Sequence, residues 1–293
     1  EGGDIMNARG PKFLPVSTRD ARSQIESNED SWSDVEPTYQ DGKGLTVFHR
    51  TVPNTNAFHD FKFDVNLATT PAGPFALARE LDLMPTWNPF VQQGALLSYK
   101  APTPTTFGRL KGYVEIALPW PIPNVSAMFS ARLFDLLDSD GSLVVALGSE
   151  AEDENAGDYG TDQRRRNGDL PPPTAPGDCP RLWLRALAKA VPLRVSGMSG
   201  GGMNDDETRF EVIARVKFPI AHTPQWVIRF VIRTMAPLIL AKVRELLPKL
   251  MDPDNVDSEY PARMEAEPAL YDALLTRRVR STLARQIARQ AGR

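Results

Sequence analysis

The sequence predicts an α+β fold in which a curved antiparallel sheet wraps around a long helix close to the C-terminus. Residues 45–218 contain a series of strand-like segments separated by turn-forming residues, and such runs favour an antiparallel sheet. Residues 223–250 form the longest helical pattern, which spans roughly 42 Å if it is helical throughout. Apolar residues occupy two flanks of this helix instead of one. A helix with two apolar flanks needs cover on both sides, and a curved sheet supplies it.

The long helix carries one narrow apolar stripe and a second apolar flank. The stripe follows steps of three and four residues, and it consists of Ile228, Ile232, Met235, Ile239, Val243, Leu246 and Leu250. The second flank consists of Val227, Phe230, Val231 and Leu238. Pro237 lies inside the helix and is expected to kink it or to remove one hydrogen bond. Charged residues interrupt the apolar run, so the helix is not expected to span a membrane.

The strand-like segments follow one another with few helical interruptions. They are residues 45–51, 60–67, 95–99, 108–118, 126–137, 142–150, 193–200 and 207–218. Residues 72–83 are predicted to be a helix that ends at Met84-Pro85, and residues 181–191 fit a helix or a strand equally well. Residues 138–141 and 197–202 have the composition of hairpin turns. Residues 119–123 form a proline-rich connection that cannot lie in the middle of a sheet.

Three regions of the chain differ in composition. Residues 1–44 are predicted to be a largely irregular tail, although scattered apolar groups such as Trp32 could dock on another surface. Residues 45–251 form the folded domain, and an acidic, arginine-containing and proline-rich stretch at 150–180 is predicted to be a solvated insertion. Residues 252–293 are predicted to be a linker followed by a basic amphipathic helix. Such a helix suits an anionic membrane, an acidic protein surface or weak packing on its own domain.

Composition excludes several classes of function. The net charge of −3 predicts no general attraction to nucleic acid, so no nucleic-acid partner is expected. One cysteine and three histidines exclude an internal disulfide and a zinc site built from these residues. The chain starts at Glu1 and not at Met, which suggests a processed or trimmed product whose targeting segment is not visible. A cytoplasmic or organellar location, peripheral to a membrane, fits this composition.

Two motifs resemble those of START domains, the lipid-transfer family related to the steroidogenic acute regulatory protein. The first is Pro119-Trp120-Pro121-Ile122 with the strands that follow it, and the second is the segment from Pro224 to Phe230. The resemblance extends over residues 45–250. It implies a helix-grip fold, in which the sheet curls around the final helix and leaves an elongated cavity for one lipid.

The resemblance also implies which residues bind the ligand. We expect the apolar lining to consist of Trp87, Tyr113, Met128, Phe134, Val227, Phe230, Val231 and Met235. Some START domains carry an acid on one inner strand near an arginine on the next, and Glu115 and Arg132 are the corresponding candidates. Such a pair can orient the polar head of a ligand, directly or through water. The alternative is that one or both of these side chains point to solvent.

The predicted function is therefore binding and transfer, or presentation, of a single hydrophobic lipid or sterol without catalysis. No pattern indicates catalytic residues, a cofactor or a metal site. The long helix and the loop at 119–124 are expected to loosen at a membrane surface and to admit the lipid. The alternative is a START-like accessory subunit of a larger, membrane-bound complex, with the tails as docking arms for protein partners. In a third interpretation, a lipid-sensing domain binds anionic membrane through its basic tail.

Overall fold

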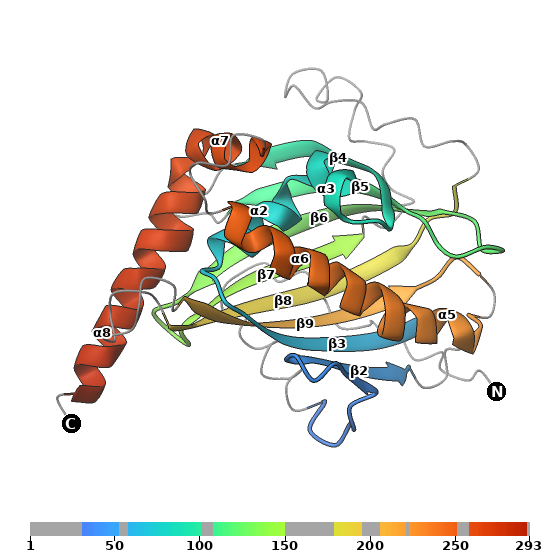
Figure 1. Ribbon diagram of the computed structural model, residues 1–293, viewed down its shortest axis with the longest axis horizontal. Helices are drawn as coiled ribbons and strands as arrows, with labels where there is room; N and C mark the ends of the chain where they lie inside the picture. Colours follow the sequence, from blue (N-terminus) through green and yellow to red (C-terminus); the bar gives the residue numbers. More distant parts are fainter. Residues whose placement is uncertain are drawn as a thin grey trace, which may run out of the picture.

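In the computed structural model, the fold of the described residues consists of nine strands and the helices that cover them (Figure 1). The structure describes residues 31–52, 58–100, 108–149, 179–194, 206–220, 223–250 and 258–291. Most of the predicted acidic insertion, with its arginines, and the glycine-rich turn at 197–202 lie outside the described residues.

The described strands form a single open sheet in the order β1-β2-β3-β9-β8-β7-β6-β5-β4, and each strand is antiparallel to its neighbours. The strands are β1 (Tyr39–Gln40), β2 (Leu45–Thr51), β3 (Phe58–Leu67), β4 (Val91–Lys100), β5 (Arg109–Ile116), β6 (Val125–Leu136), β7 (Ser142–Ser149), β8 (Trp183–Arg194) and β9 (Glu207–Lys217). The ambiguous segment at 181–191 is therefore mostly strand. It forms most of β8, which pairs with β7 on one side and with β9 on the other, and its side chains alternate between the two faces of the sheet.

Helices cover one face of this sheet (Figure 1). They are α2 (Ala72–Arg79), η1 (Leu81–Leu83), α3 (Met84–Trp87), α5 (Gln225–Phe230), η3 (Val231–Met235), α6 (Ala236–Leu250), α7 (Glu259–Ala266), η4 (Ala269–Arg278) and α8 (Val279–Ala291). The elements α5, η3 and α6 are one continuous helix of 26 residues that crosses the sheet diagonally. The predicted α+β fold, with a curved antiparallel sheet and a long helix near the C-terminus, is confirmed.

A π-helical turn divides the long helix and changes which residues it buries. Two residues of the predicted stripe, Ile228 before the turn and Ile232 within it, are each 2% exposed. After the turn the most buried positions are Leu240, Leu247 and Leu250. The stripe predicted Leu250 correctly, but it predicted Ile239 and Leu246 in place of Leu240 and Leu247. The π-helical turn, Val231–Met235, uses more residues per turn and so shifts the buried face by about one residue. It lies directly before Pro237, which has no N–H to donate to the preceding turn.

Two glycines allow the short helix η1 to lie directly on the sheet. A Cβ atom on Gly94 of β4 would come within 1.9 Å of the Leu81 carbonyl oxygen. On Gly112 of β5 it would lie 2.3 Å from Leu81 Cδ1 and 2.8 Å from Phe129 Cζ. The backbone of η1 therefore occupies the space that side chains would fill, and this close approach places the preceding helix α2 over the strands.

The chain between β3 and β4 differs from the single predicted helix. The structure breaks it at Glu80, whose ψ of 71° is not helical, and continues as η1 and α3. Pro85 lies in the first turn of α3, where a missing N–H costs nothing, and does not end the preceding helix. The break turns Glu80 and Asp82 toward the C-terminal helices.

The N-terminal tail becomes regular before residue 44. β1 pairs with β2, and Trp32 is 4% exposed because its ring packs against Phe48 while the Arg50 guanidinium lies 4.4 Å from its centroid. The docking suggested for Trp32 by its apolar character is thus observed. None of the described helices is long and apolar enough to cross a membrane.

A pair of histidines lies on the helix-covered face of β2 and β3. His49 Nε2 and His59 Nδ1 are 3.2 Å apart and share one hydrogen bond. Their rings are stacked, and His59 is only 3% exposed. Burial, together with the neighbouring His59, lowers the pKa of His49 to about 4. A charged imidazole is therefore disfavoured in the folded protein.

This pair predicts a loss of stability in mild acid. Because the folded-state pKa of His49 lies below its unfolded value of 6.5, its contribution is complete above pH 6.5 and declines as the pH falls toward about 4. The free energy of unfolding, measured with urea at steps from pH 7 to 5, is expected to decrease. In His49→Gln the decrease is smaller. If the free energy of unfolding decreases equally with pH in the two proteins, His49 is not the source of the acid sensitivity.

Candidate functional site

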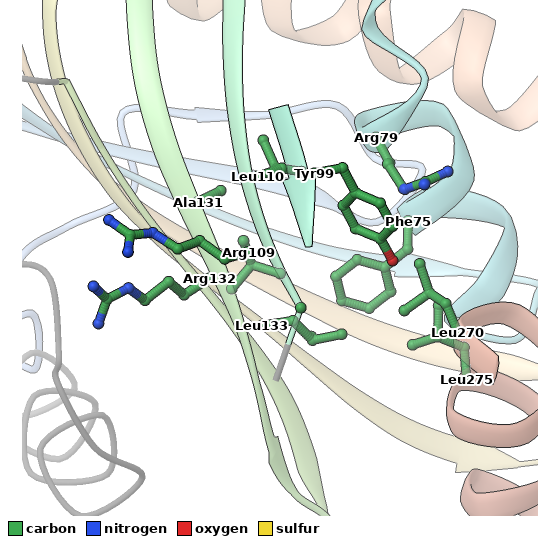
Figure 2. A pocket seen from close by; sticks show the side chains of 12 residues that line it. Phe75, Arg79, Tyr99, Arg109, Leu110, Ala131, Arg132, Leu133, Leu270 and Leu275 are labelled. Carbon is green, nitrogen blue, oxygen red and sulfur yellow. The ribbon is translucent and has the colours of Figure 1, made fainter. Parts of the chain in front are cut away.

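A partly open cavity of about 60 Å³ lies where the sheet, α2 and η4 meet (Figure 2). It is lined by Phe75, Arg79, Tyr99, Gly108, Arg109, Leu110, Ala131, Arg132, Leu133, Val145, Leu270 and Leu275. None of these residues belongs to the long helix. Most of the wall is aliphatic or aromatic, and Arg109 and Arg132 direct their guanidinium groups away from the other lining side chains (Figure 2). The cavity therefore suits an apolar group.

A buried carboxylate lies behind one wall of this cavity. Glu80, which is 4% exposed, pairs with the adjacent Arg79 and accepts a hydrogen bond from Tyr271 Oη at 3.1 Å. Arg263 Nη1 donates to its other oxygen at 3.0 Å. Burying a carboxylate is costly unless charged and hydrogen-bonding partners surround it, and these donors from α2, α7 and η4 provide such partners.

The same cluster extends outward through the two arginines. Arg263 forms a bidentate pair with Asp82, with both distances 2.7 Å, and also reaches Glu259 at 3.0 Å. Arg79 Nη2 lies 3.1 Å from Glu267 Oε1. Hydrogen bonds to Asp82 raise the pKa of Arg263 against the opposing effect of burial. Both arginines therefore remain charged, and the cluster links the α2–η1 corner to the C-terminal helices.

Arg79 and Tyr99 place polar atoms next to the apolar wall. The Arg79 guanidinium carbon lies 4.0 Å from the centroid of the Tyr99 ring, a cation–π arrangement. In Figure 2 the Tyr99 hydroxyl points toward Phe75 and Leu270. Burial raises the pKa of Tyr99, so the hydroxyl keeps its proton near neutral pH. It is therefore available as a hydrogen-bond donor at the cavity.

Residues 259–291, which we call the C-terminal segment, make further contacts with the domain. Trp87 Nε1 donates to Tyr260 Oη at 3.0 Å, and burial raises the pKa of Tyr260 to about 12. Further along the segment, Arg278 at the end of η4 pairs with the buried Asp135 and, at 2.9 Å, with Asp138. The segment thus contacts α3 near its start and the β6–β7 hairpin near its middle. A helix at 259–266 was not predicted, because the sequence there resembles a linker.

The predicted lining residues of the long helix do not border the cavity. Val227 is fully buried in the protein core, and Val231 packs against that core. The Phe230 ring packs edge-on against Phe90 with centroids 5.8 Å apart, and Met235 is partly buried. Leu238, from the same predicted flank, is 47% exposed. The second flank therefore divides between the core and solvent.

Several other predicted residues lie on the face of the sheet opposite the helices. They are Tyr113, Glu115, Met128, Arg132 and Phe134. Val114 and Phe129 belong to the main core under the helices, and side chains alternate along a strand, so the intervening residues point the other way. Phe134 packs in a separate apolar cluster with residues such as Val144 and Leu187. The sequence had left open which face of each strand looks inward, and of these five residues Arg132 is the one that also lines the cavity.

The structure does not bring Glu115 and Arg132 together. Glu115 lies opposite Ser126 and accepts a hydrogen bond from Asn124 at 2.9 Å, whereas Arg132 lies opposite Arg109. Six residues of β6 separate the two positions, which corresponds to about 20 Å along a strand. A direct acid–arginine pair between them is therefore excluded in this conformation.

The residues that do form the site were missed for identifiable reasons. An adjacent pair such as Arg79-Glu80 after an apolar run resembles the solvated end of a helix, so nothing local indicates its burial. Tyr99 lies in a segment predicted to be a strand, and nothing in the sequence indicated which residue its side chain contacts. The partial helical spacing that begins at Leu270 was the one available signal that the C-terminal segment covers an apolar surface.

The architecture is that of a helix-grip domain, and START domains are among the solved structures that resemble it. Human STARD10 is similar with a TM-score of 0.57 and 16% sequence identity, over 91% of this chain and 92% of that one. Human StAR-related lipid transfer protein 5 is similar with a TM-score of 0.56 and 13% identity, over 80% of this chain and 96% of that one. The predicted START-like fold is confirmed, and identities this low establish the fold alone.

No protein-family model matches the sequence, and no curated protein matches it either. Among the described residues, no group of three or more His, Cys, Asp or Glu side chains is arranged to hold a metal ion.

The Glu80 cluster predicts how the C-terminal segment is held. Glu80→Gln removes the buried charge that pairs with Arg79 and Arg263, and it is expected to destabilise the protein by roughly 3 kcal/mol. Hydrogen exchange of residues 259–291 should accelerate before global unfolding occurs. The matched control is Glu259→Gln, since Glu259 pairs with the same arginine but its side chain is 70% exposed. That variant is expected to lose at most about 1 kcal/mol, and similar losses in both variants would contradict the role of Glu80.

Proposed function

We propose that the protein binds one lipid or sterol molecule between the sheet and its helical cover, and that it transfers this molecule to a membrane or presents it there. The observation that carries the proposal is the START fold combined with an apolar cavity on the covered face of the sheet. One of the similar human proteins is named for lipid transfer. The proposed action is extraction and shielding, because burial of apolar surface supplies about 25 cal/mol for each Å².

Uptake of a whole lipid requires part of the helical cover to move. Pockets that enclose a drug-sized ligand measure roughly 300–1,000 Å³, and the observed cavity of about 60 Å³ accommodates only part of such a molecule. The π-helical turn in the long helix and the polar contacts of the C-terminal segment are two places where the cover can separate from the sheet.

Two exposed tryptophans support membrane contact at one end of the domain. Trp120, in the connection between β5 and β6, is 91% exposed, and Trp226, in the first turn of α5, is 42% exposed. Both lie at the end of the sheet where β5 and β9 finish. Indole rings partition favourably into the membrane interface because they combine an apolar body with an N–H donor. This end also contains the start of the long helix, where a lipid would enter.

Replacement of these tryptophans tests the proposal. The double variant Trp120→Ala/Trp226→Ala should bind neutral phosphatidylcholine vesicles at least about tenfold more weakly, since each indole buries well over 50 Å² in an interface. Transfer of lipid between donor and acceptor vesicles should slow in parallel. The control is Leu193→Ala, because Leu193 is 42% exposed at the opposite end of the sheet. Unchanged vesicle binding and transfer in the double variant would refute membrane contact at this end.

A second candidate is an accessory subunit that docks on a larger complex. The small cavity favours it, and so does α8, which extends past the end of the sheet (Figure 1). In this case the protein should co-elute with a large complex in size-exclusion chromatography of native extract. Deletion of residues 279–293 should move it to the monomer position. Elution of the intact protein as a monomer would count against this function and favour free transfer.

A further inference from the structure

Two buried polar atoms at the cavity have no hydrogen-bond partner among the described residues. They are Tyr99 Oη and Arg79 Nε. Both residues line the cavity, and both side chains are held in place by their mutual stacking. Buried donors are rarely left unsatisfied in folded proteins, because the cost of removing them from water is then not recovered. The two donors therefore indicate that the cavity receives an atom that can accept hydrogen bonds.

The remaining nitrogens of Arg79 are already engaged. Nη1 pairs with Glu80 and Nη2 with Glu267, so Nε is the guanidinium nitrogen that has no partner among the described residues. An arginine side chain can only donate, whereas a tyrosine hydroxyl can donate and accept. A carbonyl oxygen has two lone pairs and accepts from two donors at once. One carbonyl oxygen can therefore satisfy both donors together.

The charges around the site favour a neutral ligand. The cluster behind the cavity contains two arginines, Arg79 and Arg263, and four acids, Glu80, Asp82, Glu259 and Glu267. This excess of carboxylates opposes an anionic head group. Arg109 and Arg132 do not offset it, since their guanidinium groups point away from the cavity (Figure 2). The aliphatic and aromatic walls exclude a strongly hydrated group.

We propose that this cavity binds the carbonyl end of a neutral, apolar ligand through hydrogen bonds donated by Tyr99 Oη and Arg79 Nε. The inference rests on the proposed function, of which it specifies the class of ligand and the end of the molecule that enters first. The observed volume takes the carbonyl group and the few carbons next to it. The rest of the ligand extends through the open side. Leu270 and Leu275 make the C-terminal segment one wall of this site.

The test uses the full chain and three probes of equal chain length: 2-heptanone, n-heptane and heptanoate. Binding is followed by NMR titration, and the carbonyl carbon of 2-heptanone is labelled with ¹³C. The ketone is expected to bind most tightly and heptanoate least. The carbonyl signal of the bound ketone should lie downfield of its position in an apolar solvent such as hexane, and its infrared stretch should lie at lower frequency than there, as donated hydrogen bonds require. Tighter binding of heptanoate than of the ketone would overturn the proposal.

Tyr99→Phe removes the hydroxyl and keeps the ring on which Arg79 stacks. It should weaken the binding of 2-heptanone by about threefold to tenfold, which is the usual effect of one neutral hydrogen bond. The binding of n-heptane should not change. Tyr113→Phe is the matched control, because the Tyr113 hydroxyl is also buried without a partner among the described residues but does not line the cavity. Equal loss of ketone and alkane in Tyr99→Phe, or an equal effect of Tyr113→Phe, would overturn the proposal.

A second variant tests the place of binding independently of the hydroxyl. Ala131→Val adds two methyl groups at the cavity wall, and it should abolish binding of 2-heptanone and n-heptane while the thermal transition remains cooperative. Retained binding of both would overturn the proposal.

Lipid transfer between vesicles separates this inference from the proposed function. If transfer occurs but 2-heptanone does not bind, the inference fails and the function stands, with water as the partner of both donors. If neither occurs, both fail.

Discussion

The constraint on which the whole structure depends is that one broad apolar face of the sheet must be covered. Nine strands at about 4.8 Å spacing make a surface roughly 40 Å wide, and a single helix covers a strip of about 10 Å. The long helix therefore cannot do this alone, even though it crosses the sheet diagonally. The α2–α3 corner and the C-terminal segment cover the rest of the face. Three separate covers do not fit together without gaps, and the cavity lies where two of them meet the sheet.

The buried carboxylate of Glu80 connects two of these covers. It lies at the break between α2 and η1, and its partners Arg263 and Tyr271 come from helices almost two hundred residues later in the chain. The same carboxylate fixes Arg79 and thereby the polar edge of the cavity. Because a buried charge tolerates few arrangements of its partners, this contact specifies one position for the C-terminal segment more strongly than apolar packing would.

The buried face of a strand could be predicted from the sequence where apolar residues alternate with charged ones, and could not where both faces are apolar. On β3, Phe61 and Phe63 alternate with Lys62 and Asp64, so the buried face was evident and the antiparallel sheet could be predicted. On β5 and β6 both faces carry large apolar groups, and a shift of one residue moves every side chain to the other face. The choice between Phe129 and Phe134 therefore needed the helices that cover one face and not the other.

Long-range contacts account for most of the remaining differences. Pro237 predicted an irregularity in the long helix. Only the packed structure shows that this irregularity is a π-helical turn and that the turn shifts the buried face of the helix. The partners of Glu80 follow no local period, since they lie on a different part of the chain. The candidate site was consequently outside the reach of pattern analysis, whereas the class of fold was within it.

The contact of η1 with Gly94 and Gly112 has a consequence for the identification of relatives. The nearest atom at Gly94 is a backbone carbonyl oxygen, which cannot move aside as a side chain can. Any chain that places the same short helix on the same two strands must therefore lack a side chain at the position of Gly94, and must have a small residue at that of Gly112. With identities of 13% and 16% to similar structures, overall sequence comparison has little discriminating power. These two spaced positions, together with an acid in the break of the preceding helix, form a compact signature by which chains that share this packing of η1 on the sheet could be recognised.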